Sequence, residues 1–163
     1  MANNVHLRDV VETDLLIFFE QQLNPEATQM AALPSRNKEM FMTHWIRIMA
    51  DDSILIKTIL FNGSVAGNIV CFDQLGEREV GYWLGKEYWG KGVATQALAE
   101  FLKDIDTRPL YAHVAKHNIA SRRVLEKCGF TISGEDSFFS QALGKNVEEY
   151  ILTLDASELL NSD

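Results

Sequence analysis

The residues best suited to chemistry lie in one stretch, 80–102, which reads VGYWLGKEYWGKGVATQALAEFL. Its first part alternates as a strand does, and the helical spacing of apolar residues begins at Val93. Between the two stand Gly85, Gly90 and Gly92. A helix that starts on glycines exposes backbone N–H groups at the positive end of its dipole, and no side chain keeps a phosphate away from them. The stretch therefore predicts a phosphate-binding turn.

Two nucleotide-binding patterns come close to this turn and differ from it at one position. A P-loop, G-x-x-x-x-G-K-[ST], needs a hydroxyl for Mg²⁺ where Gly92 stands. A Rossmann fingerprint needs Gly or Ala where Thr95 stands, and no acidic residue ends the apolar run 110–115 to bind a ribose. The remaining alternative is a turn that only caps a helix, which two glycines around Lys91 fit less well than a single glycine would.

The turn resembles the acyl-CoA pyrophosphate loop of the GNAT superfamily of N-acyltransferases. That loop reads [QR]-x-x-G-x-[GA], and residues 89–94 match it with Trp89 in place of Gln or Arg. The replacement is typical of the branch that resembles ribosomal-protein alanine/serine acetyltransferases, in which Tyr-Trp-Gly-Lys-Gly is common. A second block, NIASRRVLEKCGF at 118–130, resembles the Asn-x-x-Ser segment of that branch. The resemblance covers nearly the whole chain.

The resemblance implies an α+β fold with a mixed, mostly antiparallel central sheet of about seven strands and helices on both faces. Two strands, here 78–84 and 109–114, would splay apart so that the pantetheine arm of acetyl-CoA fills the gap and pairs with the backbone of the first strand. The resemblance thus implies acetyl-CoA as co-substrate. The positions that match the family's cofactor-binding residues are Trp83, Leu84, Trp89, Gly90, Lys91, Gly92, Val93, Ala94, Thr95, Asn118 and Ser121.

Two residues are expected to handle protons. Glu79 lies four residues before Trp83, hence on the same strand face, and a carboxylate there can deprotonate an amine directly or through water. Its alternative is a solvated charge at the strand end. Asn118 and Ser121 share one helix face, and Ser121 offers a hydroxyl to the leaving sulfur. The tyrosine that is the common acid in the family would fall at Leu125, which cannot donate, so the acid is expected to be Ser121; the alternative is a helix-surface serine.

Other residues are expected to border the site. His113 and His117 flank it, and the pKa of histidine suits proton shuttling, although each is more often a surface or structural residue. In the family, the first helices border the acceptor pocket, which makes Met30, Arg36 and Trp45 expected neighbours of the substrate. Trp45 also belongs to an apolar stripe at helical spacing, which is typical of a core.

Periodicity and breakers place these residues on a regular succession of elements. We expect Thr13 to cap the first helix, Asn62 and Gly63 to form a hairpin turn, and Gly129 to end the last helix in a left-handed conformation. A polar tail, 157–163, follows the last strand. The pattern predicts strands at 5–11, 53–61, 64–73, 78–84, 109–114, 130–133 and 148–153, and helices at 14–23, 26–36 (with a loop), 38–50, 93–106 and 118–127.

Composition limits the class of protein. At 163 residues with 47% hydrophobic content, the chain predicts one domain, 1–163, with a sizeable core. A net charge of −8 argues against nonspecific nucleic-acid binding and suits a cationic amine substrate. Cys71 and Cys128 show neither metal nor disulfide spacing, and no His/Cys/Asp cluster predicts a metal. Residues 1–8 show no secretory signal and the longest apolar run, 15–19, is too short to span a bilayer. We expect a cytoplasmic protein that binds no membrane, with a homodimer left open.

The function favoured by these residues is an acetyl-CoA-dependent N-acetyltransferase that acts on a primary amine by direct attack in a ternary complex. One alternative is a GNAT-fold protein that binds acyl-CoA without chemistry, as a sensor or interaction partner. Another is an interaction module without a ligand, which the complete loop 90–95 disfavours. The acceptor stays open among a ribosomal-protein N-terminus, an antibiotic, a polyamine and a metabolite amine.

Overall fold

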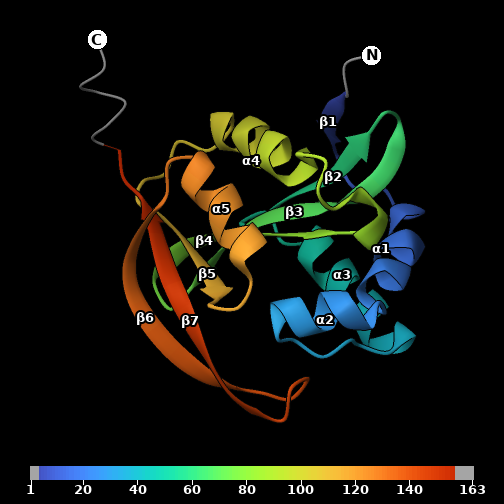
Figure 1. Ribbon diagram of the computed structural model, residues 1–163. Helices are drawn as coiled ribbons and strands as arrows, with labels where there is room; N and C mark the ends of the chain where they lie inside the picture. Colours follow the sequence, from blue (N-terminus) through green and yellow to red (C-terminus); the bar gives the residue numbers. More distant parts are fainter. Residues whose placement is uncertain (1–3, 157–163) are drawn as a thin grey trace.

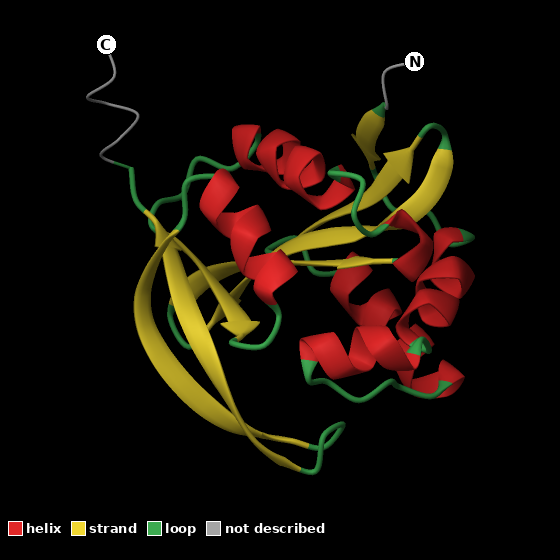
Figure 2. Ribbon diagram, viewed as in Figure 1, coloured by secondary structure: helices red, strands yellow, loops and turns green. Residues whose placement is uncertain are grey.

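The computed structural model describes residues 4–156, in which one seven-stranded sheet carries helices on both faces (Figures 1 and 2). The strands are β1 Val5–Arg8, β2 Leu55–Phe61, β3 Ser64–Gln74, β4 Glu77–Leu84, β5 Leu110–Ala115, β6 Thr131–Ser140 and β7 Lys145–Leu154. The α-helices are α1 Asp14–Gln22, α2 Pro25–Ala31, α3 Lys38–Met49, α4 Val93–Lys103 and α5 Ile119–Lys127, and a 3₁₀ turn spans Lys86–Tyr88. The mixed α+β fold implied by the resemblance is confirmed.

The sheet has the strand order β1-β2-β3-β4-β5-β7-β6, and its only parallel neighbours within residues 4–156 are β4 and β5. Those two strands share a single register pair, Glu79 with Tyr111. By contrast, β4 is paired with β3 along its whole length, and β5 is paired with β7 from Leu110 to Ala115. The two strands therefore diverge beyond Glu79, as the resemblance implies, and the β5-facing edge of β4 is left without a strand partner.

Each face of the sheet has its own core. On one face, α4 buries Val93, Ala97 and Phe101, whose four-residue spacing puts them on one side of the helix, against the sheet and Leu125 of α5. On the other face, α1 and α3 contribute Leu15, Phe18, Phe41 and Trp45. Figure 1 shows α4 and α5 on one side of the central strands and α1 and α3 on the other. The divergence of β4 and β5 is thus held between two packed layers.

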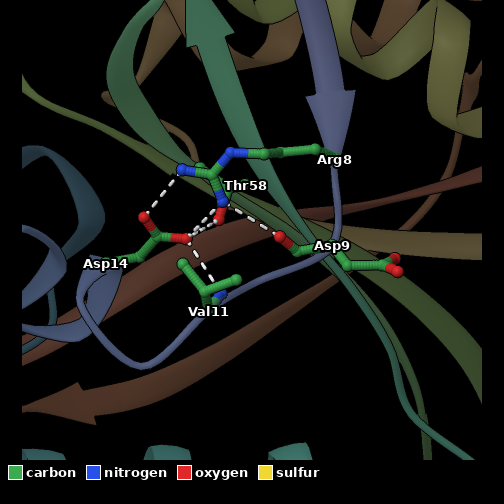
Figure 3. Close-up of polar contacts among 5 residues, drawn as sticks. All are labelled: Arg8, Asp9, Val11, Asp14 and Thr58. Atoms are coloured by element: carbon green, nitrogen blue, oxygen red, sulfur yellow. Dashed lines mark hydrogen bonds and ion pairs between the residues drawn. The ribbon is translucent and has the colours of Figure 1, made fainter.

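A buried carboxylate joins the start of α1 to the sheet (Figure 3). Both oxygens of Asp14 accept from the Arg8 guanidinium, at 2.7 and 2.9 Å, and Thr58 Oγ1 donates to one of them at 2.7 Å. The backbone N–H of Val11 donates to the same oxygen at 3.0 Å. Thr13 occupies the N-cap position but its side chain makes no capping bond, so the expectation that it caps α1 was wrong. The carboxylate of Asp14, the first residue of α1, accepts the Val11 N–H and so closes the turn before the helix.

The last two strands are longer than the sequence predicted. They form a long hairpin in which Thr131 pairs with Thr153 and Ser140 with Lys145, with one register shift between Ile132 and Gly134, and Figure 2 shows it extending past the rest of the sheet. Most of β6 is exposed, so the strand is defined by its hydrogen-bonded register rather than by an alternating apolar face. At the other end of the chain β1 stops at Arg8, three residues early, because the chain turns there to bring Asp14 back to the guanidinium.

The expected turns are present and the helix bounds differ slightly. Asn62 (φ 50°) and Gly63 (φ 86°) form the β2–β3 hairpin turn, and Gly129 (φ 98°) follows α5 in the left-handed region. Helix α2 begins one residue early at Pro25, because the side chain of Asn24 accepts from the first backbone N–H groups of the helix. Within residues 4–156, no helix has the length and apolarity needed to cross a membrane. The tail 157–163 lies outside the described residues.

The contacts of Asp14 predict a loss of stability in acid. Burial opposes the charge, but the bonds from Arg8, Thr58 and the Val11 amide outweigh it and lower the pKa of Asp14 to about 2. A carboxylate with a lowered folded-state pKa stabilises the fold fully above its unfolded value of about 3.9 and loses that contribution as the pH falls toward about 2. We expect Asp14→Asn to cost about 2–3 kcal/mol at pH 7 and to flatten the acid dependence below pH 5.

Urea denaturation between pH 7 and pH 2 measures this effect. The control is Asp9→Asn, which removes the exposed carboxylate that pairs with Lys57 and should change the acid dependence far less. An Asp14→Asn protein whose stability falls in acid as steeply as the wild type would contradict the prediction.

Candidate active site

A cavity of about 460 Å³ lies beside the end of β4, between the starts of α4 and α5, with α2 at its rim. Ten of the eleven residues expected to bind the cofactor line it. They are Trp83, Leu84, Trp89, Gly90, Gly92, Val93, Ala94, Thr95, Asn118 and Ser121. Lys91 is the exception, since it is exposed and does not line the cavity. Two segments some 25 residues apart are thereby brought to one cavity, which is the arrangement that a long cofactor requires.

The glycine turn presents the start of α4 to the cavity. Gly90 (φ 74°) and Gly92 (φ 77°) both adopt left-handed backbone conformations, which glycine reaches without strain. Gly92 is the N-cap of α4 and no side chain caps the helix, so its first N–H groups stay available. A Cβ added at Gly90 would meet nothing within 4 Å. These glycines are therefore required by the backbone conformation and by access to the amides, not by crowding.

The end of β4 is held by contacts that sequence reasoning missed. The indole of Trp89 donates to the carbonyl oxygen of Leu84 at 3.2 Å, which ties the turn to the strand. On the β3 side, a Cβ at Gly67 would lie 2.0 Å from the carbonyl oxygen of Trp83, so only glycine allows this approach. The available signal was a glycine inside an apolar strand pattern, which often marks a close backbone approach.

The hydroxyl of Ser121 has a partner that the sequence did not reveal. Asn118 caps α5 as expected, its side chain accepting from the N–H of Ser121 at 3.2 Å. The Tyr82 hydroxyl donates to Ser121 Oγ at 3.2 Å. Burial raises the pKa of Tyr82, against the opposing effect of the bond to Ser121, so the phenol stays a proton donor. Because Tyr82 donates, Ser121 is free to direct its own O–H into the cavity.

Glu79 is buried on β4, three residues before Tyr82, the first residue of that strand to line the cavity, and does not line it itself. The residue is 8% exposed, and its carboxylate accepts no hydrogen bond from the described residues, so it is not a solvated charge. The carboxylate faces His113, whose Nε2 lies 3.6 Å from Glu79 Oε2. Burial raises the pKa of Glu79; the charge of His113 lowers it, and those of Glu77 and Glu149 raise it further. The result is a carboxylate whose affinity for a proton exceeds that of an ordinary glutamate.

The expected acceptor neighbours lie in different places. Met30 lines the cavity. Trp45 is 5% exposed and packs against Phe18, with ring centroids 5.0 Å apart, so it is a core residue away from the cavity. Arg36 is exposed, its backbone pairs with the side chain of Gln22, and it does not line the cavity.

Two further features were not expected from sequence spacing. Arg123 and Lys127 of α5 also line the cavity and supply positive charge to it. The second feature is a cluster of Glu77, Glu79 and His113, which β4 and β5 bring together with potential metal-ligand atoms within 4.8 Å of one another. The spacing of these three residues along the chain gave no metal signal because they come from two strands. The expectation that the protein needs no metal stays a prediction.

The chain matches one known protein family over most of its length. A model of the acetyltransferase (GNAT) domain matches residues 4–131. Because this match covers well over half of the chain, the protein belongs to the GNAT acetyltransferase family. The family indicated by the two sequence motifs is confirmed.

Two known relatives match part of the chain, and one of them is named as a ribosomal acetyltransferase. The Bacillus subtilis (strain 168) protein named "Putative ribosomal N-acetyltransferase YdaF" is 30% identical over 105 residues, which cover 60% of this chain and 57% of the relative. An uncharacterised N-acetyltransferase of Bacillus licheniformis is 28% identical over 83 residues, or 48% of this chain and 47% of that protein. The matched segments thus span about half the length of these relatives.

Solved structures show the same fold. The spermidine N-acetyltransferase of Vibrio cholerae, in complex with CoA and spermine, gives a TM-score of 0.82 at 18% identity, covering 96% of this chain and 98% of that one. The aminoglycoside acetyltransferase AAC(6')-Ib, in complex with ribostamycin and coenzyme A, gives 0.76 at 16% identity and 97% coverage of both chains. At these identities the likeness concerns the fold.

The glycine turn predicts the effect of a substitution on cofactor affinity. Gly92→Val should weaken acetyl-CoA binding about tenfold or more, since the loss of one charge-assisted hydrogen bond costs roughly 1.5–3 kcal/mol. Titration calorimetry with acetyl-CoA measures the change.

The matched control is Gly63→Val. Gly63 also has a left-handed backbone (φ 86°) and open space around it, but lies in the β2–β3 turn away from the cavity. This variant carries a similar backbone strain and should bind acetyl-CoA normally. A folded Gly92→Val protein with unchanged affinity would refute the assignment of the turn to the pyrophosphate.

Proposed function

We propose that the described residues act as a single acetyl-CoA-dependent N-acetyltransferase domain. The acetyl group passes from the thioester to a primary amine, a protein N-terminus or a small-molecule amine, by direct attack in a ternary complex. One observation carries the proposal: the uncapped start of α4 on left-handed glycines meets the unpaired edge of β4 in one cavity. A helix start binds phosphate and a free strand edge binds an amide-rich chain, so together they suit pantetheine pyrophosphate.

The two ends of the cofactor bind different parts of the chain in this proposal. We place the pyrophosphate on the backbone of residues 90–95 and the pantetheine amides along the edge of β4 at Trp83 and Leu84. Arg123 and Lys127 add favourable charge for the phosphates. A backbone N–H of β4 would face the thioester carbonyl and stabilise the oxyanion that forms during attack. When bound, acetyl-CoA supplies the activated acetyl group and the thiolate leaving group.

Proton transfer is divided between two residues, Glu79 and Ser121. Glu79, buried and without a hydrogen-bond donor among the described residues, takes the proton of the acceptor ammonium. Ser121 directs its hydroxyl to the departing sulfur, and the bond from Tyr82 makes that hydroxyl a better donor. Ser121 would therefore stabilise the thiolate by donating a hydrogen bond to it. The hydrogen bond that Tyr82 donates to Ser121 strengthens this interaction.

The acceptor is proposed to be cationic before it reacts. Glu77 and Glu149 lie near the proposed base Glu79, and this concentration of negative charge favours an ammonium group. The names of the relatives and structural neighbours include a ribosomal acetyltransferase, a spermidine acetyltransferase and an aminoglycoside acetyltransferase. All three descriptions are compatible with an amine acceptor.

The second candidate is a catalytically silent protein that binds acyl-CoA. The observation in its favour is that Glu79 does not line the cavity that would hold the cofactor. Calorimetry with acetyl-CoA does not separate the two candidates, because both bind it. Thiol release with a panel of primary amines does, since only the enzyme forms free CoA in the presence of an acceptor.

The role of Glu79 predicts the behaviour of Glu79→Gln. Turnover should fall by roughly 10²–10⁴, the usual contribution of general base catalysis, while acetyl-CoA affinity should barely change. The loss should shrink as the pH rises, because more of the amine is then already neutral. Ser121→Ala acts on the leaving group, so its defect should persist at high pH.

A pH–rate profile of both variants with one good acceptor amine measures these effects. Wild-type turnover for Glu79→Gln across the whole profile would mean that Glu79 is not the base.

The cluster of Glu77, Glu79 and His113 calls for a separate test with a chelator. Because acyl transfer needs a base and an oxyanion site but no Lewis acid, we expect turnover to survive dialysis against EDTA. Turnover that is lost in EDTA and restored by zinc or magnesium would assign a metal to this cluster.

A further inference from the structure

His113 lies between two glutamates that come from different strands. Its Nδ1 is 2.5 Å from Glu149 Oε2 on β7, and its Nε2 is 3.6 Å from Glu79 Oε2 on β4. The Glu79 and Glu149 side chains are 11% and 14% exposed, whereas His113 is an exposed residue whose side chain keeps 27% of its surface open. The imidazole thus faces the proposed base and also reaches solvent.

The contact with Glu149 determines which nitrogen faces Glu79. An ionised carboxylate can only accept, so Nδ1 must carry the hydrogen in this bond. In the neutral imidazole Nε2 then has the free lone pair, and Nε2 is the atom directed at Glu79. His113 is therefore oriented to receive a proton from Glu79.

We propose that Glu79 and His113 act together as the base, that the amine's proton comes to rest on His113 Nε2, and that Glu149 is a positioning residue for the imidazole. This inference rests on the proposed acetyl transfer and adds to it a residue that the two-residue scheme of Glu79 and Ser121 does not contain.

The proton transfer is balanced at each step. An N–H bond of the acceptor ammonium breaks and an O–H bond forms on Glu79 Oε2, which leaves a neutral amine to attack. The O–H bond then breaks as an N–H bond forms on His113 Nε2, so Glu79 is again a carboxylate beside an imidazolium. The Nδ1–H bond to Glu149 is kept throughout. As the amide forms, a second N–H bond of the amine breaks and its proton goes to the departing thiolate, which leaves as the thiol of CoA. The imidazolium finally releases its Nε2 proton to solvent, and the pair is ready for another amine.

The surrounding charges suit an imidazolium. The groups that face His113 are Glu77 and Glu79 on β4 and Glu149 on β7. Burial lowers the pKa of His113, but the bond to Glu149 and the charges of all three carboxylates outweigh it, so the pKa is raised. Two groups that share one proton titrate as a pair, and the acidic limb of the pH–rate profile then belongs to both.

Glu149→Gln tests the pair most directly. The amide oxygen can still accept from Nδ1, but the imidazolium loses an anionic partner, so the pKa of His113 should fall. The acidic limb of the profile of kcat/KM should therefore move to lower pH, while acetyl-CoA affinity stays unchanged. Titration of the His113 ring nitrogens by NMR follows the same pKa without any turnover. A shifted NMR titration with an unmoved kinetic limb would overturn the proposal, because Glu149 would then act on His113 alone.

Chemical rescue supplies the second test. His113→Ala should lower turnover at neutral pH about tenfold or more, a fraction of the full effect of a general base, and free imidazole should restore part of it in proportion to its concentration. Adding Glu149→Gln to this variant should cause no further shift of the limb, because the two changes act through one group. His6→Ala, which removes an exposed histidine on β1, is the control and should behave as the wild type.

The outcomes separate the two proposals. Wild-type turnover in His113→Ala, or a loss that imidazole does not relieve, would overturn the role of His113 while leaving acetyl transfer in place. If the wild-type protein releases no CoA with any amine of the panel, acetyl transfer fails and the proposed base fails with it.

Discussion

The structure depends on one interrupted contact, the parallel pairing of β4 with β5. The pairing consists of Glu79 with Tyr111 and goes no further, although both strands continue and are fully paired on their other sides. Unpaired backbone groups inside a protein are costly, so a sheet that opens here needs something to satisfy the free edge. The glycine turn and the start of α5 meet at this opening, and the last paired residue, Glu79, is the proposed base. Cofactor site and proton acceptor thus follow from one break in the sheet.

Much of the fold could be predicted because local patterns and tertiary packing agree. The four-residue spacing in α4 matches its buried face, and the turn at Asn62 and Gly63 forms the hairpin that it predicts. The long β6–β7 hairpin could not be predicted, because β6 is mostly exposed and lacks an alternating apolar face. The absence of a capping bond from Thr13 was equally hidden, since it results from the contact of Asp14 with Arg8, a residue outside the helix.

The candidate site, like the fold, could be predicted from the sequence only in part. The glycine turn is continuous in sequence, so its motif could be recognised there. Ten of the eleven residues expected to bind the cofactor line the cavity. Pairs that only tertiary structure creates were missed: Tyr82 with Ser121, and Glu149 with His113. Neither pair has a characteristic spacing, because its members come from different elements. Family analogy placed Trp45 near the acceptor, but its helical spacing correctly indicated a core residue.

The central claim is that the free edge of β4 receives the pantetheine arm. Amide hydrogen exchange of residues 81–84, with and without acetyl-CoA, tests it directly, since a backbone N–H exchanges slowly only when it is bonded or buried. The account predicts that saturating acetyl-CoA slows exchange in this segment and at the start of α4, and leaves the exposed strand β6 unchanged. Binding of acetyl-CoA, verified by calorimetry, with no slowing in residues 81–84 would contradict it.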